Sequence, residues 1–140
     1  STILLRLEDA LRSQNVEGFV NVLKSVFASI PHTLFLPQEA YYHSLVYLLL
    51  KLLGFTIHAE PLMSRGRTDA VLELPEVVYV LEFKVQRNQE NAQTALQQIR
   101  DKEYAAPYRA AGKAILLLGI VFDPVNRAIG DWAMQRGIAE

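Results

Sequence analysis

The sequence contains no cysteine. This absence excludes disulfide bonds and thiolate metal ligands, and it fits a reducing cytoplasm, which is where we expect the protein to reside. A large excess of charge of either sign is also missing, because 14 Lys and Arg residues nearly balance 15 Asp and Glu residues. The balance argues against a strongly basic nucleic-acid-binding protein, so any contact with nucleic acid must come from a local patch.

Long hydrophobic runs are missing as well. The most apolar windows, residues 45–53 and 114–122, are too short to span a bilayer, and Lys51 interrupts the first of them. The chain starts at Ser1 with a segment of helical spacing instead of a methionine and a basic signal sequence, so we expect a piece of a longer protein. Its 140 residues are enough for one domain with a sizeable core.

The first 36 residues carry apolar side chains at helical spacing, in two sets separated by the polar residues 13–15. The sets are Leu4, Leu7 and Leu11, and then Phe19, Val20, Leu23, Val26 and Phe27. We predict two helices that form a packing arm or a linker to a neighbouring domain. Pro31 disfavours helix at the residue before it, so the helical pattern should break there. We expect the arm or linker to cover residues 1–36 and a second unit to cover residues 37–140.

Within residues 37–140, apolar patterning predicts seven further elements. They are a helix over 38–53 that ends at Gly54, strands over 55–63, 67–74 and 77–85, a helix over 91–104, and strands over 114–122 and 127–135. Strand 114–122 is apolar on both faces, as a strand covered by helices on both sides should be. In the last strand, alternation should place Ile129 and Asp131 on one face. The pattern predicts an α/β protein with a mixed sheet.

Three charged residues interrupt segments that otherwise have the pattern of buried strands. A hairpin loop centred between Pro75 and Glu76 would place Asp69 directly opposite Glu82. Two opposed, buried carboxylates are destabilising unless something neutralises them, and a divalent metal ion is the natural candidate. Lys84 points to the same face as Glu82, because side chains alternate along a strand. The alternative is a structural ion pair between Asp69 and Lys84 beside an exposed Glu82.

This combination of an acidic residue, a hairpin and a Glu-x-Lys motif resembles the PD-(D/E)xK nuclease superfamily, with Asp69, Glu82 and Lys84 at the signature positions. Thr68 replaces the proline of the traditional motif, at a position that varies widely in the superfamily. The surrounding segments are similar to the domain that closes a family of bacterial and archaeal AAA-ATPase-like proteins. These segments are "YYHSLVYLLLKLLGF", "SRGRTDAVLEL", "VYVLEFK" and "ALQQIRDKEYAAPYRAAGKAILLLGIVFD". The resemblance implies a restriction-endonuclease-like αβββαβ core with a mixed central sheet.

The resemblance also implies metal-dependent phosphodiester hydrolysis of nucleic acid, with DNA favoured over RNA and Mg²⁺ or Mn²⁺ as cofactor. The implied catalytic residues are Asp69, Glu82, Lys84 and Gln98, and the implied metal ligands are Asp69, Glu82, the backbone carbonyl of Phe83, and Glu39. Two of these residues also have ordinary explanations. Glu39 lies in the first turn of its helix, where the dipole favours a carboxylate, and Gln98, like its neighbour Gln97, can be a solvated helix residue.

Basic residues near the signature could follow a nucleic-acid backbone, and we assign this role to Arg65, Arg67 and Arg87. Arg100 and Lys102 could also contact the nucleic-acid backbone, but a place on a solvated, charged helix face explains them equally well. His43 could contact phosphate or fill a polar niche in the core, and we favour the niche. The expected partners are nucleic acid, an N-terminal ATPase domain in the full-length chain and a second copy of the chain, without a membrane. A catalytically silent module serving an ATPase, or a pure interaction domain, stays open as an alternative.

Overall fold

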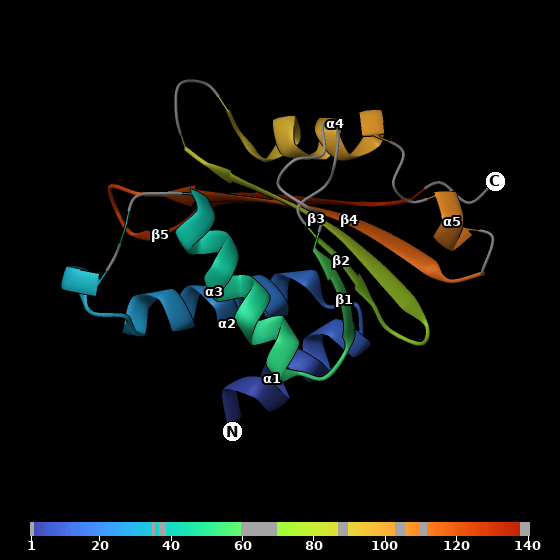
Figure 1. Ribbon diagram of the computed structural model, residues 1–140, viewed down its shortest axis with the longest axis horizontal. Coiled ribbons are helices and arrows are strands. Elements are labelled where there is room, and N and C mark those ends of the chain that lie inside the picture. The colour runs from blue at the N-terminus through green and yellow to red at the C-terminus, as the bar shows by residue number, and fades with distance from the viewer. Residues whose placement is uncertain are drawn as a thin grey trace.

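Figure 1 shows the computed structural model, which describes residues 2–34, 36, 39–59, 70–86, 90–102, 106–109 and 112–137. Its elements are α1 (Thr2–Arg12), α2 (Val16–Ser29), the 3-10 turn η1 (His32–Leu34), α3 (Glu39–Leu52), β1 (Thr56–Ala59), β2 (Ala70–Glu73), β3 (Val77–Val85), α4 (Ala92–Lys102), α5 (Ala106–Arg109), β4 (Ala114–Asp123) and β5 (Ala128–Arg136). The predicted order of helices and strands is confirmed, and the short α5 is an addition. No helix in these ranges is long and apolar enough to cross a membrane.

The five strands form one mixed sheet in the order β1-β2-β3-β4-β5. Only β3 and β4 are parallel, and the intervening α4 crosses one face of the sheet between them (Figure 1). Helices α1, α2 and α3 cover the other face. This arrangement confirms the predicted α/β class, and it explains why β4 is apolar on both sides.

The hairpin of β2 and β3 has the predicted register. Leu74 N–H donates to Val77 O at 2.9 Å, which closes the turn around Pro75 and Glu76. The described pairs run from Glu73 with Val78 to Ala70 with Leu81. Asp69, the residue directly before Ala70, lies outside the described residues.

Two cores lie on the two faces of the sheet. On the face of α1, α2 and α3, the rings of Tyr42 and Phe122 stack at 4.6 Å, and Phe27 meets Phe122 edge to face at 5.3 Å. On the other face, residues of α4 pack against alternate residues of the strands. This smaller core consists of Val71, Val78, Val80, Leu96, Ile99, Ile115 and Leu117. Sequence alternation therefore separates Glu82 and Lys84, on the α4 face, from Phe83 on the other face.

The first two helices share the larger core with the sheet. Leu11 of α1 and Leu23 of α2 are fully buried in it. The Tyr79 hydroxyl of β3 donates to the carbonyl oxygen of Leu11 at 2.5 Å, and burial raises the pKa of Tyr79 to about 12. The two helices are thus packed and bonded to the sheet, while a domain boundary after residue 36 stays a prediction.

Strand β5 does not alternate as the sequence predicted. Phe122 pairs with Ile129, but Val121 pairs with Asp131, so Gly130 is an extra residue in a β-bulge. Ile129 consequently packs in the core of α1, α2 and α3, whereas Asp131 reaches α4. The prediction that these two residues share a face was wrong, because a bulge shifts the alternation by one residue.

Candidate functional site

Strand β3 carries a carboxylate into the interior of the protein. Eight of its nine residues are buried, and Glu82 retains 4% of its accessible surface. Among the described residues, it is the one charged residue that is buried. Burying a carboxylate is costly unless compensating charge or hydrogen bonds accompany it. The position of Glu82 therefore needs a positive partner nearby.

Lys84 supplies positive charge on the same face. Its Nζ lies 3.8 Å from Glu82 Oε2, which is longer than a hydrogen bond but close enough for strong attraction in a buried setting. The side chain of Lys84 is 15% exposed and that of Glu82 is 5% exposed. The Lys84 side chain thus has more access to solvent than the buried carboxylate beside it.

The neighbours of Glu82 differ on the two sides of β3. On one side, β4 pairs along the whole strand and places Gly119 beside Glu82. On the other side, the described part of β2 pairs only with residues 78–81. The predicted pairing of Asp69 with Glu82 would follow next in this register. Asp69, Arg65, Arg67 and Arg87 all lie outside the described residues, so their predicted roles stay predictions.

Gly119 allows α4 to approach the sheet closely beside Glu82. A Cβ atom at this position would lie 2.8 Å from Ala92 O and 2.8 Å from Ala95 Cβ, which is shorter than any ordinary contact. The sequence analysis did not single out Gly119, although a glycine inside a buried strand is a known sign of close approach. The start of α4 therefore packs directly onto β4 next to the buried carboxylate.

Two side chains fix the start of α4. The Asp131 carboxylate accepts a hydrogen bond from Ala92 N–H at 3.0 Å, and Asn91 Oδ1 accepts one from Thr94 N–H at 3.0 Å. These acceptors satisfy backbone donors that a helix start otherwise leaves open. Asp131 reaches Ala92 because the bulge at Gly130 turns it to the α4 face. The sequence analysis noted Asp131 only as a strand residue.

Gln98 and the polar residues Gln97 and Arg100 lie on different sides of α4. Arg100 donates to Gln135 of β5 and, at 2.7 Å, to Gln97, so these residues belong to the β5 flank. Helical geometry places the half-buried Gln98 on the opposite flank, which faces β3. The choice of Gln98 over Gln97 as a site residue, and its catalytic role, stay predictions.

The start of α3 lies at the same end of the sheet. The ring of His43, one turn after Glu39, lies 4.9 Å from the ring of Phe83. His43 is half-buried in this ring contact, and its predicted place in a polar niche stays a prediction. The side chain of Glu39 lies outside the described part of the chain, so its metal-binding role stays a prediction, as does that of the Phe83 carbonyl.

The predicted metal ligands all provide oxygen atoms, which together would suit a hard cation. Carboxylate oxygens are the ligands that Mg²⁺ and Mn²⁺ prefer, and the buried Glu82 supplies them in an otherwise apolar strand. Within the described ranges, no group of three or more His, Asp and Glu side chains could hold a metal. The second predicted carboxylate, Asp69, belongs to the undescribed part of the chain.

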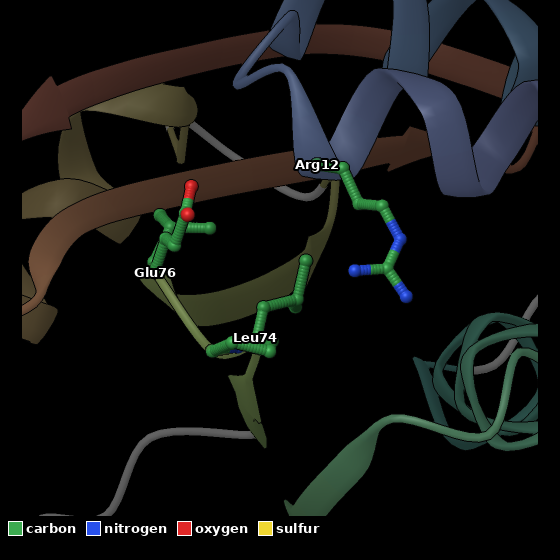
Figure 2. A pocket seen from close by; sticks show the side chains of 5 residues that line it. Arg12, Leu74 and Glu76 are labelled. Atoms are coloured by element: carbon green, nitrogen blue, oxygen red, sulfur yellow. The ribbon is translucent and has the colours of Figure 1, made fainter.

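The opposite end of the sheet holds a separate ionic cluster. Lys113 Nζ donates to Glu73 Oε2 and to Leu74 O, both at 3.0 Å. The hydrogen bond from Lys113 lowers the pKa of the Glu73 carboxyl. A cavity of about 160 Å³ adjoins the hairpin turn, and Figure 2 shows the Arg12 side chain extending from α1 beside it. This end is remote from Glu82, so it provides controls for the experiments below.

Comparison with known proteins adds the family. Residues 37–132 match the model of the PD-(D/E)XK nuclease superfamily, a range that includes Glu82, Lys84 and Gln98. The chain is also 36% identical over 135 residues to "Uncharacterized protein in vnfD 5'region" of Azotobacter chroococcum mcd 1. This match covers 93% of the chain but 26% of the relative, so the chain spans about a quarter of the relative's length. The family match and the mixed sheet confirm the resemblance to the PD-(D/E)xK nuclease superfamily and the predicted restriction-endonuclease-like fold, while the similarity to the AAA-ATPase-associated domain stays a prediction.

Proposed function

We propose, since this chain belongs to the PD-(D/E)XK nuclease superfamily, that it hydrolyses phosphodiester bonds of nucleic acid with Mg²⁺ or Mn²⁺ as cofactor. DNA is the favoured substrate. The main support in the structure is the buried Glu82 with the Lys84 ammonium group 3.8 Å away on the same face of β3. The predicted N-terminal ATPase domain and a second copy of the chain stay predictions.

In this proposal, Asp69 and Glu82 hold the cation, assisted by the backbone carbonyl of Phe83 and by Glu39. When bound, a divalent cation supplies positive charge to the phosphate and makes water a better nucleophile at neutral pH. The chain contributes a fixed position for Glu82, because β4 pairs with its strand and α4 packs close beside it. A carboxylate held in this way loses little conformational freedom when it binds a cation.

Lys84 and Gln98 provide hydrogen-bond donors for the attacking water and the phosphate. The Lys84 ammonium group carries three N–H donors and is partly exposed, so it can orient the attacking water or neutralise charge that develops on the phosphate. Gln98, on the β3 flank of α4, offers an amide that can position water or a phosphate oxygen. Arg65, Arg67 and Arg87 would bind phosphates on either side of the scissile bond.

Calorimetric titration of Mn²⁺ and Mg²⁺ tests the site before the substrate is known. Wild-type protein should bind the cation, Asp69→Ala and Glu82→Gln should not, and Glu73→Gln should bind as the wild type does. The control removes a carboxylate at the far end of the same hairpin. Cation binding that survives in both site variants would refute the assignment of these ligands.

A cleavage assay then separates the nuclease from a silent binding module. Supercoiled plasmid, single-stranded DNA and RNA are incubated with Mg²⁺, with EDTA as the negative control. A nuclease converts at least one substrate only when the metal is present, and Glu82→Gln abolishes the conversion. Nucleic acid that is bound but never cleaved would favour the silent module.

A further inference from the structure

The turn between β4 and β5 lies at the same end of the sheet as the candidate site. The strands β3 and β4 are parallel, and Val85 at the end of β3 pairs with Phe122 near the end of β4. The turn of residues 124–127, which follows β4, therefore lies next to the carboxyl end of β3. Figure 1 shows this turn at the left of the sheet, near the carboxyl end of β3, with η1 below it on the side of α1, α2 and α3. At roughly 4.8 Å between neighbouring strands, β5 lies about 10 Å from β3. A bound nucleic acid can therefore contact both strands.

The tip of this turn presents an apolar side chain to solvent. Val125 is 80% exposed, the highest value for a large hydrophobic residue among those described. The turn beneath it is well ordered by hydrogen bonds. Asp123 Oδ1 accepts from the N–H groups of Val125 at 2.9 Å and Asn126 at 3.2 Å, and Asp123 Oδ2 accepts from Asn126 Nδ2 at 2.6 Å. The fold thus holds Val125 outward, and the negative charge of Asp123 is engaged inside the turn.

Arg127 ends the turn in an unfavourable backbone conformation. Its φ is +54°, which lies in the left-handed region. Glycine adopts this region without penalty, whereas any residue with a Cβ atom is disfavoured there. The guanidinium NH1 lies 2.9 Å from His32 Nδ1 of η1. A guanidinium group only donates, so Nδ1 is the acceptor, and the bond fixes the cation between the turn and η1. A single exposed contact adds little stability, so this bond does not offset the unfavourable φ of Arg127 by much.

We propose that the β4–β5 turn and η1 form a contact surface for the phosphate backbone of the substrate. In this surface, Arg127 binds a phosphate with the guanidinium donors that His32 does not use, and Val125 packs against the adjoining sugar. The inference rests on the proposed function, because it assigns substrate contacts beside that site. It also supplies a cationic group from the described residues, apart from the arginines predicted from the sequence.

The other end of β5 provides a matched control. Arg136 NH1 donates to Gln14 Oε1 at 2.9 Å, so it also joins β5 to the helical layer through one exposed bond. Gln14 has a φ of +59°, like that of Arg127. Arg136 pairs with Leu116 near the start of β4, which is the end of the sheet away from the candidate site. The two arginines thus differ mainly in their distance from the site.

Binding of a labelled DNA duplex is measured by fluorescence anisotropy over a range of salt concentrations, in EDTA so that no cleavage occurs. Arg127→Gln should weaken binding several-fold and reduce the slope of log K against log salt by about one, as expected for one lost phosphate contact. Arg136→Gln should leave both quantities unchanged. A wild-type slope in Arg127→Gln, or an equal reduction in both variants, would overturn the inference.

Glycine substitutions separate a binding role from a structural one. Arg127→Gly relieves the unfavourable φ, so its thermal midpoint should be equal to or above that of the wild type while DNA binding is weakened. Gln14→Gly should show the same thermal behaviour with unchanged binding. If Arg127→Gly instead lowers the midpoint and binds DNA normally, the arginine is a structural contact and the inference fails.

The outcomes distinguish this inference from the proposed function. Wild-type protein that cleaves DNA while Arg127→Gln binds like the wild type would overturn the contact surface alone. Wild-type protein that neither binds nor cleaves duplex DNA, single-stranded DNA or RNA would overturn both. Dependence on Arg127 that appears with RNA and not with DNA would support the phosphate contact and correct the substrate.

Discussion

Glu82 and Lys84 project from the same face of β3, with the Lys84 Nζ 3.8 Å from Glu82 Oε2. The strand fixes this relationship, because residues two apart on a strand share a face. Glu82 is buried in a strand that β4 pairs along its whole length, whereas Lys84 keeps partial access to solvent. The pair therefore combines a buried carboxylate, proposed to bind the cation, with a partly exposed ammonium group, proposed to contact the substrate or the attacking water. Replacing either residue should consequently impair a different step.

Replacing the acidic residues should abolish cation binding and cleavage without unfolding the protein. In Asp69→Ala, a carboxylate that repels Glu82 is removed, so the free energy of unfolding should stay the same or rise slightly. Urea denaturation of the wild type and the variant measures the difference, and calorimetry with Mn²⁺ checks binding. An unfolded Asp69→Ala protein would contradict the opposed arrangement of the two carboxylates.

Lys84→Ala should retain cation binding and lose turnover by roughly two or more orders of magnitude, the usual scale for a positioned catalytic group. The cation ligands are untouched in this variant, which is why binding survives. Steady-state cleavage of the preferred substrate measures the loss. Lys113→Ala, which removes a lysine at the opposite end of the sheet, is the matched control and should keep wild-type turnover. Equal turnover in both variants would remove Lys84 from the mechanism.

Ionisation of Tyr79 should lower stability between pH 10 and pH 12. Burial raises the pKa of Tyr79 to about 12 in the folded protein, against 10.0 ordinarily. The unfolded chain therefore releases this proton first, and the stabilisation, complete below pH 10, is lost as the pH rises toward 12. The loss should approach roughly 2–3 kcal/mol, at about 1.4 kcal/mol for each unit of pKa.

Tyr79→Phe isolates this effect from that of the other tyrosines. At neutral pH it should cost about 1 kcal/mol, because the hydrogen bond to Leu11 O is lost while Gln14 N–H still donates to that oxygen. Urea denaturation from pH 7 to pH 12 should show the wild type ahead of the variant at neutral pH and the order reversing as the pH approaches 12, because the ionisation loss exceeds the value of the hydrogen bond. A constant gap would mean that Tyr79 does not carry the raised pKa.

Much of the fold could be predicted because its signals are local. The turn at Pro75 and Glu76, together with the alternation of the two strands, fixes one register, since a shift by one residue would turn every buried side chain to the wrong face. The described pairs from Glu73 with Val78 to Ala70 with Leu81 confirm that register. The Glu-x-Lys spacing likewise placed Glu82 and Lys84 on one face.

The features that the sequence did not predict depend on packing between distant segments. The bulge at Gly130 turns Asp131 toward α4, and only the location of α4 shows that its carboxylate accepts from Ala92 N–H. Gly119 looked like any small residue in an apolar strand until the helix was placed above it. A sequence indicates that a glycine interrupts a strand, but not which element comes close there.

Gly119→Ala should test whether the close approach of α4 matters for the site. The added methyl group would meet Ala92 O and Ala95 Cβ, so we expect a loss of about 1–3 kcal/mol in the free energy of unfolding, as for other overpacked cores. Because α4 must move outward beside Glu82, turnover should also fall at temperatures where the variant is fully folded. Urea denaturation and cleavage kinetics measure the two effects separately.

Gly137→Ala is the matched control for this substitution. Its added Cβ would lie 3.0 Å from Ile115 Cβ, a similar crowding at the far end of the sheet. It should cost some stability and leave turnover unchanged, because no element of the candidate site borders it. If Gly119→Ala and Gly137→Ala reduce turnover equally, the loss reflects general destabilisation. If only Gly119→Ala reduces turnover, the close packing of α4 on β4 is needed to position the catalytic residues near Glu82.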